Sequence, residues 1–328
     1  MMGEKKSVYD AAEEMGIGGE EFLNLCTSLT FLGGMDPSMR DQMVKALKEK
    51  PRVPVIWMQF QDCTGCTESF IRSTSPGPVS ILFDLISLDY TEVLSAAAGE
   101  QAEASKQAVM EKYRGEYLLA VEGSIPEDSR YLMIGGRPAL EIFQEAARGA
   151  RAVIAYGSCS SWGGIAAAFP NPTGARPIRQ FIGEEKPVIL VPGCPPIAEV
   201  MVGVIAYILA TGELPELDRR GRPKIFYRHR IHEVCDRRPA FDQGLFAESF
   251  DDEGAKAGYC LFKLGCRGTS TFNSCAELLW NGGTGFPIQA GNICLGCSEE
   301  NFWDKGSFFA KRTKVPGKQT TAKTTVTI

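Results

Sequence analysis

The sequence predicts an α/β protein: an open parallel sheet with helices over residues 51–212, then a loop-rich domain over residues 213–312. Two observations predict this. Apolar segments of strand length alternate with helical segments up to residue 211, and this alternation is typical of a parallel sheet. After a charged, proline-bearing connector at 213–223, glycines, aromatic residues and cysteines continue with little periodicity. With 328 residues the chain is long enough for two domains, since single cores stop growing at about 250 residues.

The predicted strands lead into cysteines. Helices are expected at Glu141–Arg148 and Ile197–Thr211, and strands at Val55–Phe60, Ile86–Asp89, Tyr117–Val121, Ala152–Tyr156 and Val188–Val191. The first of these strands and the last two are each followed by a cysteine loop. Because ligands of open parallel sheets bind beyond the carboxyl ends of the strands, we expect Cys63, Cys66, Cys159 and Cys194 to converge.

Both ends of the chain are predicted to lie outside the core. Residues 1–50 read as mostly polar helix with a short apolar piece at Phe22–Leu32, which predicts a leader or N-terminal arm. Residues 313–328 are rich in Lys and Thr and are expected to form a flexible tail.

The composition argues against several classes of function. A hydrophobic fraction of 44% and a charged fraction of 23% are ordinary for a folded domain. The net charge of −5 provides no basic field to attract nucleic acid, and no run reaches the roughly 18 apolar residues that a transmembrane helix needs. Eleven cysteines in a chain large enough to fold without disulfides make metal ligation a strong competitor to disulfide bonding.

The first cysteine set is Cys63, Cys66, Cys159 and Cys194. Four thiolates suit a 4Fe-4S cluster. Zinc also accepts four sulfurs, and buried thiols without a metal are a further alternative. A redox CxxC of the thioredoxin kind needs no distant third and fourth cysteine, so the cluster is the favoured interpretation.

A second set and a third set follow in the C-terminal part. The second set is His232, Cys235, Cys260 and Cys266, which could hold zinc or an iron–sulfur cluster, although a lone histidine is often structural. The third set is Cys275, Cys294 and Cys297, whose three thiolates suit a 3Fe-4S cluster, while spacing leaves a distant fourth ligand open. Pro287 lies between these sulfurs in sequence.

Three sets in one chain favour a chain of redox centres over three structural zinc sites. A folded chain of this length has a radius of gyration of roughly 20 Å, too far for direct electron exchange between partners on opposite sides.

The carboxylates of the sequence give little further evidence of function. Nothing in the sequence pairs Glu122, whereas Glu68, five residues after Cys63, is the one carboxylate expected to touch the first cluster or to relay protons.

Taken together, these motifs resemble one family, the small subunit of group 1 nickel–iron hydrogenases, over residues 54–310. The matching segments are Asp62–Phe70, Ile86–Tyr90, Ala120–Gly123, Gly157–Gly163, Pro192–Pro196, Arg230–Pro239, Gly265–Gly268, Gly296–Glu299 and Phe302–Gly306. The resemblance implies a flavodoxin-like domain with a proximal 4Fe-4S cluster on the first set. It also implies a distal 4Fe-4S cluster on the second set and a medial 3Fe-4S cluster on the third, where Pro287 takes the position of a fourth ligand.

The resemblance further implies a heterodimeric enzyme. The nickel–iron centre belongs to the large subunit, and this chain is expected to relay electrons between that site and an acceptor such as a cytochrome or another redox protein. The alternatives are the small relay subunit of a related quinone-linked complex, and a zinc-stapled scaffold without redox activity.

Two further features of the sequence concern subtype and location, and the second is a departure from the family. Oxygen-tolerant relatives carry extra cysteines at the positions of Gly65 and Gly164, so a standard proximal cluster is expected here. The stretch that matches the family's twin-arginine export signal, at residues 18–23, lacks both arginines. A cytoplasmic location is therefore expected, with a periplasmic or membrane-associated one as the alternative.

Overall fold

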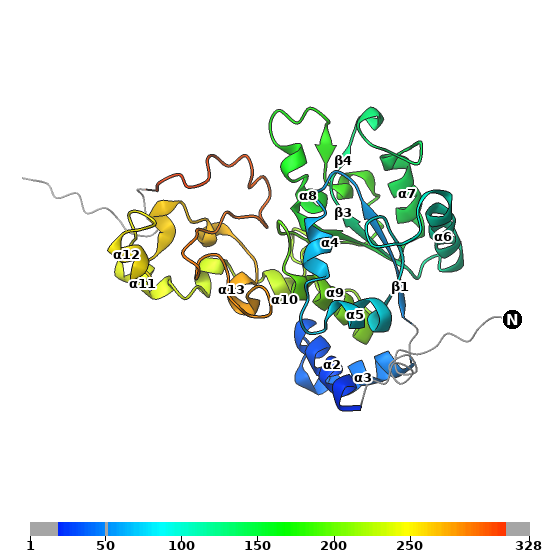
Figure 1. The fold of residues 1–328 in the computed structure, drawn as a ribbon, viewed down its shortest axis with the longest axis horizontal. Helices are drawn as coiled ribbons and strands as arrows, with labels where there is room; N and C mark the ends of the chain where they lie inside the picture. Colours follow the sequence, from blue (N-terminus) through cyan, green and yellow to red (C-terminus); the bar gives the residue numbers. More distant parts are fainter. Residues whose placement is uncertain (1–18, 50–51, 313–328) are drawn as a thin grey trace, which may run out of the picture.

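The computed structural model describes residues 19–49 and 52–312, which form two parts lying side by side (Figure 1). One part is a twisted sheet covered by helices on both faces. The other holds the residues from about 224 onwards and consists of loops and short helices. The predicted tail at 313–328 and residues 1–18 of the predicted leader lie outside the described residues.

The sheet has five parallel strands in the spatial order β2 (Ile86–Thr91), β1 (Val53–Gln59), β3 (Leu118–Glu122), β7 (Ala152–Tyr156) and β9 (Val188–Val191). Counted along the chain, this is the order 2-1-3-4-5, which is the flavodoxin-like topology. The predicted fold class is confirmed. The order reverses between β1 and β3, so a ligand site is expected where these two strands end.

Both faces of the sheet are buried, which explains why its strands are nearly continuous apolar runs. Val55 and Trp57 of β1 belong to the apolar cluster under α9 (Ala198–Thr211), whereas Ile56 and Met58 belong to the cluster under α7 (Ala139–Gly149). Successive side chains of a strand point to opposite faces, so one short segment contributes to both cores. Helix α6 (Gly99–Lys112) packs on the second face as well.

An N-terminal helical hairpin corrects one sequence prediction. Helices α2 (Gly19–Leu32) and α3 (Arg40–Glu49), joined through the 3-10 turn η1 (Pro37–Met39), pack against α9 (Figure 1). Cys26, Leu29, Met43 and Leu47 are fully buried in the same cluster as α9. The expectation of an arm outside the core is wrong for residues 19–49. The reason is α9, which buries 11 of its 14 residues and therefore needs cover on more than one side.

The remaining elements are short. In the sheet part the short helices are α4 (Gly65–Phe70), α5 (Pro78–Ser80), the π-helix η2 (Ile81–Leu85), η3 (Ser129–Tyr131), α8 (Gly157–Trp162), η4 (Ile165–Ala167) and η5 (Ile178–Phe181). Two short antiparallel pairs join β4 (Ile125–Pro126) to β8 (Ala175–Arg176) and β5 (Met133–Ile134) to β6 (Arg137–Pro138). In the C-terminal part the short helices are α10 (Lys224–Tyr227), η6 (Ile231–Glu233), α11 (Arg238–Gln243), α12 (Glu253–Lys256), η7 (Leu261–Leu264), η8 (Gly268–Ser270) and α13 (Cys275–Leu278). Within the described residues, no helix has the length and apolar character needed to cross a membrane.

The packing of the hairpin predicts that Leu29→Ala destabilises the sheet part. Leu29 is fully buried, so truncation loses apolar contact and leaves a cavity beside α9, at a cost of about 2–5 kcal/mol in the free energy of unfolding. Phe31→Ala is the matched control, since Phe31 lies on the same helix with 69% of its surface exposed. Denaturant unfolding of both variants measures the difference. Equal stability of the two would show that the hairpin does not belong to the core.

Candidate metal centres

The first set gathers at the carboxyl edge of the sheet, as the sequence predicts. Cys63 and Cys66 follow β1, Cys159 lies in α8 directly after β7, and Cys194 follows β9. Burial raises the pKa of the Cys66 thiol well above its ordinary value, and the Glu122 carboxylate and the thiols of the other three cysteines add to the rise. The four thiols are therefore close enough to influence one another's charge.

Local backbone geometry brings these loops together. Asp62 Oδ1 accepts a hydrogen bond from the amide of Thr64 at 2.8 Å, which closes a turn around Cys63. Gly157 has φ +91°, and a Cβ there would lie 2.4 Å from the Cys66 sulfur, so only glycine allows α8 to approach so closely. Gly164 has φ +65°, and its Cβ would lie 2.3 Å from the Cys159 sulfur.

Glu122 is a buried carboxylate that the sequence analysis left without a partner. It ends β3 with 1% of its surface exposed, and its two oxygens accept hydrogen bonds from the amides of Cys66 and Thr67 at 2.8 and 2.9 Å. The Thr67 hydroxyl donates a third at 2.6 Å. Glu122 thus fixes the start of α4 at the point between β1 and β3 where the strand order reverses. The sequence signal for this role is the position of Glu122 directly after the predicted strand Tyr117–Val121.

Glu68 occupies a different place. It lies on α4 with its side chain more than half exposed, and it forms an i,i+4 ion pair with Arg72 at 2.6 Å. Glu122 binds the amide of Cys66, so the idea that Glu68 alone was placed to contact the first set is wrong. A proton-relay role for Glu68 stays a prediction.

The second set lines one small cavity of about 20 Å³. His232, Cys235, Cys260 and Cys266 all contribute to its wall, from two short segments of the C-terminal part at 232–235 and 260–266. The His232 ring packs edge-to-face on Phe241 with 4.4 Å between ring centroids. Burial, with a smaller effect of the Arg238 charge, lowers the pKa of His232, which favours the neutral imidazole that metals bind.

The third set lines a larger cavity of about 400 Å³. Cys275, Cys294 and Cys297 form part of its wall together with Pro287, and Cys194 of the first set also reaches it. The indole Nε1 of Trp280 donates a hydrogen bond to the Cys275 sulfur at 3.4 Å. Such bonds to a ligand sulfur raise the reduction potential of an iron–sulfur cluster, because they stabilise the additional negative charge.

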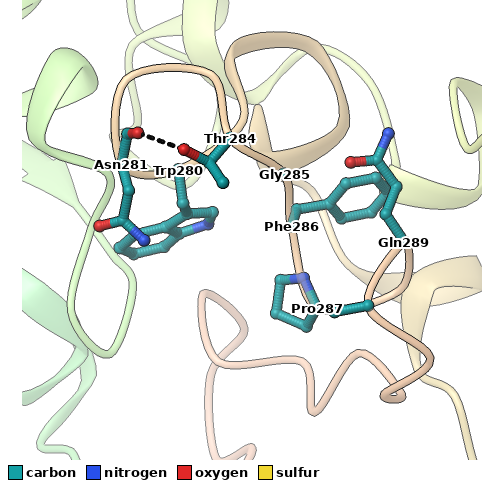
Figure 2. Close-up of a pocket in the computed structure, with 8 residues that line it drawn as sticks. Trp280, Asn281, Thr284, Gly285, Phe286, Pro287 and Gln289 are labelled. Atoms are coloured by element: carbon teal, nitrogen blue, oxygen red, sulfur yellow. Dashed lines mark hydrogen bonds between the residues drawn. The ribbon is translucent and has the colours of Figure 1, made fainter.

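An open pocket of about 650 Å³ adjoins this cavity. Figure 2 shows the Trp280 ring on one side of the pocket and Phe286 and Pro287 on the other, and all three residues also line the cavity of the third set. Asn281 and Thr284 close the turn beside Trp280 through a 2.8 Å hydrogen bond. Trp280, Phe286 and Pro287 therefore form a wall that the pocket and the cavity of the third set share.

The three sets form a row with the third in the middle. Cys194 of the first set lines the cavity of the third, and the amide of Cys294, in the third set, donates to the Cys266 sulfur of the second set at 3.4 Å. Residue spacing alone did not determine this order, although the family resemblance implied it.

The donor chemistry fits iron–sulfur clusters. Within the described residues, none of the ten cysteines of the three sets forms a disulfide. Burial raises the pKa of Cys159 and Cys235 to about 12 and that of Cys260 to about 11, so bare thiolates are unfavourable here, and a cationic iron centre would stabilise them. In residues 19–49 and 52–312, no group of three or more His, Cys, Asp or Glu side chains has the geometry of a site for one metal ion.

Family models match both parts of the chain. Residues 227–310 match the C-terminal domain of the NiFe/NiFeSe hydrogenase small subunit, and residues 63–208 match the 20 kDa subunit of NADH ubiquinone oxidoreductase. The uptake hydrogenase small subunit of Azotobacter vinelandii is 51% identical over 317 residues, covering 96% of this chain and 88% of the relative. The chain belongs to the nickel–iron hydrogenase small-subunit family. The corresponding subunit of Cupriavidus necator is 50% identical over 312 residues, with 94% and 86% coverage.

Solved hydrogenases share the fold of this small subunit. The reduced, active Ni-Fe-Se hydrogenase of Desulfomicrobium baculatum matches with a TM-score of 0.74 and 36% identity, covering 80% of this chain and all of that one. The oxidised [NiFeSe] hydrogenase of Desulfovibrio vulgaris Hildenborough matches with a TM-score of 0.74 and 33% identity, over 80% and 99%. As a member of this family the chain is the small subunit of a hydrogenase, and the catalytic site lies in the large subunit.

The contacts of Glu122 predict that Glu122→Gln loosens the CxxC loop. A glutamine keeps one acceptor oxygen but places an NH₂ group against a backbone donor, which costs about 1–3 kcal/mol in the free energy of unfolding. Glu68→Gln, on the exposed side of α4, is the control and should change stability little. Denaturant unfolding compares the two, and a Glu122→Gln protein as stable as the control would contradict the assignment.

Proposed function

We propose that this small subunit relays electrons between the nickel–iron site of its large subunit and an external acceptor through three iron–sulfur clusters. The observation that carries the proposal is the row of three donor sets with a contact at each junction. The first and third sets share a cavity wall through Cys194, and the second and third are joined by the bond from Cys294 to Cys266. A row of this kind spans the chain from the sheet edge to the C-terminal loops.

The donors support particular cluster types. Four thiols in the first set suit a 4Fe-4S cluster, and three thiols with one neutral imidazole in the second set complete four ligands for another. The third set provides three thiols, and Pro287, which lines the same cavity, has no donor atom to offer. This supports a 3Fe-4S cluster between the two 4Fe-4S clusters.

The proposed electron transfer requires no covalent chemistry in this chain. Oxidation of one dihydrogen at the large subunit yields two protons and two electrons. Iron–sulfur clusters bound at the three sets would supply one-electron redox chemistry, with no bond made or broken in this chain. This chain's residues would hold the clusters in line, and they bury the cysteines Cys66, Cys260, Cys266, Cys275 and Cys294. A redox protein such as a cytochrome accepts the electrons beyond the second set.

Metal analysis of the purified heterodimer tests the proposal. We expect iron and acid-labile sulfide for three clusters, nickel in the large subunit, and reduction of a dye that depends on hydrogen. Cys275→Ala should abolish the 3Fe-4S signal in electron paramagnetic resonance, whereas Cys26→Ala should retain it, because Cys26 lies on α2 and belongs to none of the three sets. Zinc in place of iron would support the scaffold alternative, and a partner without nickel would refute the hydrogenase activity while leaving the relay.

The face around the first set supports a docking site for the large subunit. Cys63 and Cys194 are exposed, although a cluster there must be shielded from water and must lie close to the catalytic site. Ile165 and Phe169, which follow the helix of Cys159, are 56% and 87% exposed. Large apolar side chains beside exposed ligands are typical of a surface that a partner covers.

Phe169→Asp is predicted to abolish copurification of the large subunit. The substitution removes a buried apolar contact and places at the interface a charge that must be desolvated. Together these weaken binding of the large subunit by several kcal/mol, or about a hundredfold or more. Phe31→Asp is the matched control, because Phe31 is 69% exposed but lies on α2. Pull-down of the large subunit with each tagged variant gives the answer. Loss of the partner in both variants, or in neither, would contradict this docking face.

A further inference from the structure

The serine before Cys159 joins two loops that belong to different cysteine sets. Ser158 has 2% of its surface exposed, and its hydroxyl donates a hydrogen bond to the carbonyl of Cys297 in the third set. The same oxygen accepts from the amide of Gly193 at 3.1 Å, next to Cys194 of the first set. The amide of Ser158 in turn donates to the Gly193 carbonyl at 2.8 Å. One side chain thus bridges the first set to the third.

Helix α8 holds the third-set loop at a second point as well. Four residues beyond Ser158, the indole of Trp162 donates to the carbonyl of Ser298 at 3.1 Å. Two consecutive carbonyls, those of Cys297 and Ser298, therefore accept bonds from the helix that carries Cys159. The loop at 294–298 has no helix or strand of its own, so its backbone position depends on such bonds.

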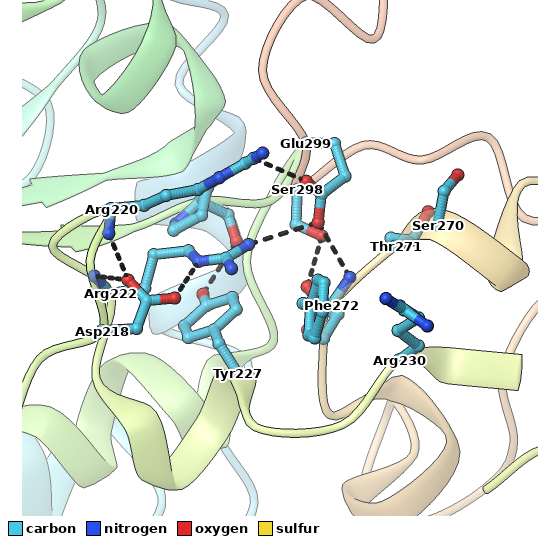
Figure 3. Close-up of polar contacts among 12 residues, drawn as sticks. Asp218, Arg220, Arg222, Tyr227, Arg230, Ser270, Thr271, Phe272, Ser298 and Glu299 are labelled. Atoms are coloured by element: carbon cyan, nitrogen blue, oxygen red, sulfur yellow. Dashed lines mark hydrogen bonds and ion pairs between the residues drawn. The ribbon is translucent and has the colours of Figure 1, made fainter. Parts of the chain in front are cut away.

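A separate cluster of charges holds the end of this loop. Figure 3 shows Glu299 beside Arg220 and Arg222 of the connector, at 2.9 and 3.2 Å, and beside Phe272, whose amide donates to it at 2.8 Å. Arg222 is buried and also pairs with Asp218 at 2.8 Å. The buried pair of Arg222 with Glu299 keeps the connector joined to this loop without the Ser158 hydroxyl. Removal of that hydroxyl should therefore shift the loop while the protein still folds.

We propose that Ser158 is a positioning residue that holds Cys297 against the loop of Cys194 and so sets the separation between the first and third centres. The inference rests on the proposed relay. Electron tunnelling falls steeply with separation, so even a small displacement of Cys297 slows transfer between these two centres. Because the bond reaches a backbone carbonyl, Ser158 acts on the position of the ligand and touches no reacting group.

The test uses the heterodimer with Ser158→Ala, and the matched controls are Ser160→Ala and Ser161→Ala. All three serines are buried in α8, but the hydroxyls of Ser160 and Ser161 bond only to the carbonyls of residues 155–157, within their own segment. Each protein is first checked for iron content and for the signals of all three clusters. It is then mixed with hydrogen and freeze-quenched, and electron paramagnetic resonance follows the reduction of the third-set cluster.

We expect Ser158→Ala to keep its iron and to reduce the third-set cluster severalfold more slowly than the native protein, while both controls keep the native rate. Ser158→Thr, which restores a hydroxyl, should recover most of the rate. If Ser158→Ala loses iron, Trp162→Phe replaces it, since this change removes the bond to Ser298 but keeps an aromatic ring, and it too should slow the step. The inference is overturned if the variant that retains iron reduces the third-set cluster at the native rate. It is also overturned if the two control variants reduce that cluster as slowly as this variant does. Absence of clusters from the native protein would instead refute the proposed function.

Discussion

The carboxyl edge of the parallel sheet is the constraint on which the rest of this structure depends. Parallel strands end at a common edge, so the direction of the strands alone brings loops that are far apart in sequence together there. Three of the five strands deliver cysteines to this edge, and β3 delivers Glu122, whose carboxylate binds the amides of the CxxC loop. The first set is therefore built by rigid elements and placed where the strand order reverses.

The C-terminal part is held by a different kind of cohesion. Over residues 224–312, its helices are no longer than six residues, and isolated bridges take the place of a sheet. Side-chain bonds to backbone carbonyls take over the task of regular structure, as with Arg267, whose guanidinium bonds the carbonyls of Phe302 and Gly306. Thiols from separate loops converge on two cavities in this part. Metal clusters bound there would link the loops and contribute directly to folding.

The N-terminal hairpin shows how one helix can determine the place of others. Helix α9 has almost no polar face, so it could not serve as the outer layer of a two-layer fold. Helices α2 and α3 cover it and bury Leu29 and Met43. A segment that reads in isolation as a weak leader thus becomes part of the core, because its few apolar residues meet a surface that requires them.

The sequence by itself determined the topology class, the strands that lead into cysteines and the grouping of the donors into three sets. These follow from local periodicity, motif spacing and family resemblance, which need no knowledge of distant contacts. Only the tertiary structure decided that Glu122 binds the CxxC loop, that the hairpin of residues 19–49 packs against α9, and that Ser158 links Cys297 to the loop of Cys194. Each of these depends on a contact between residues far apart in the chain, such as the 139 residues between Ser158 and Cys297. Neither composition nor spacing carries information about such contacts, since the fold alone brings those residues together.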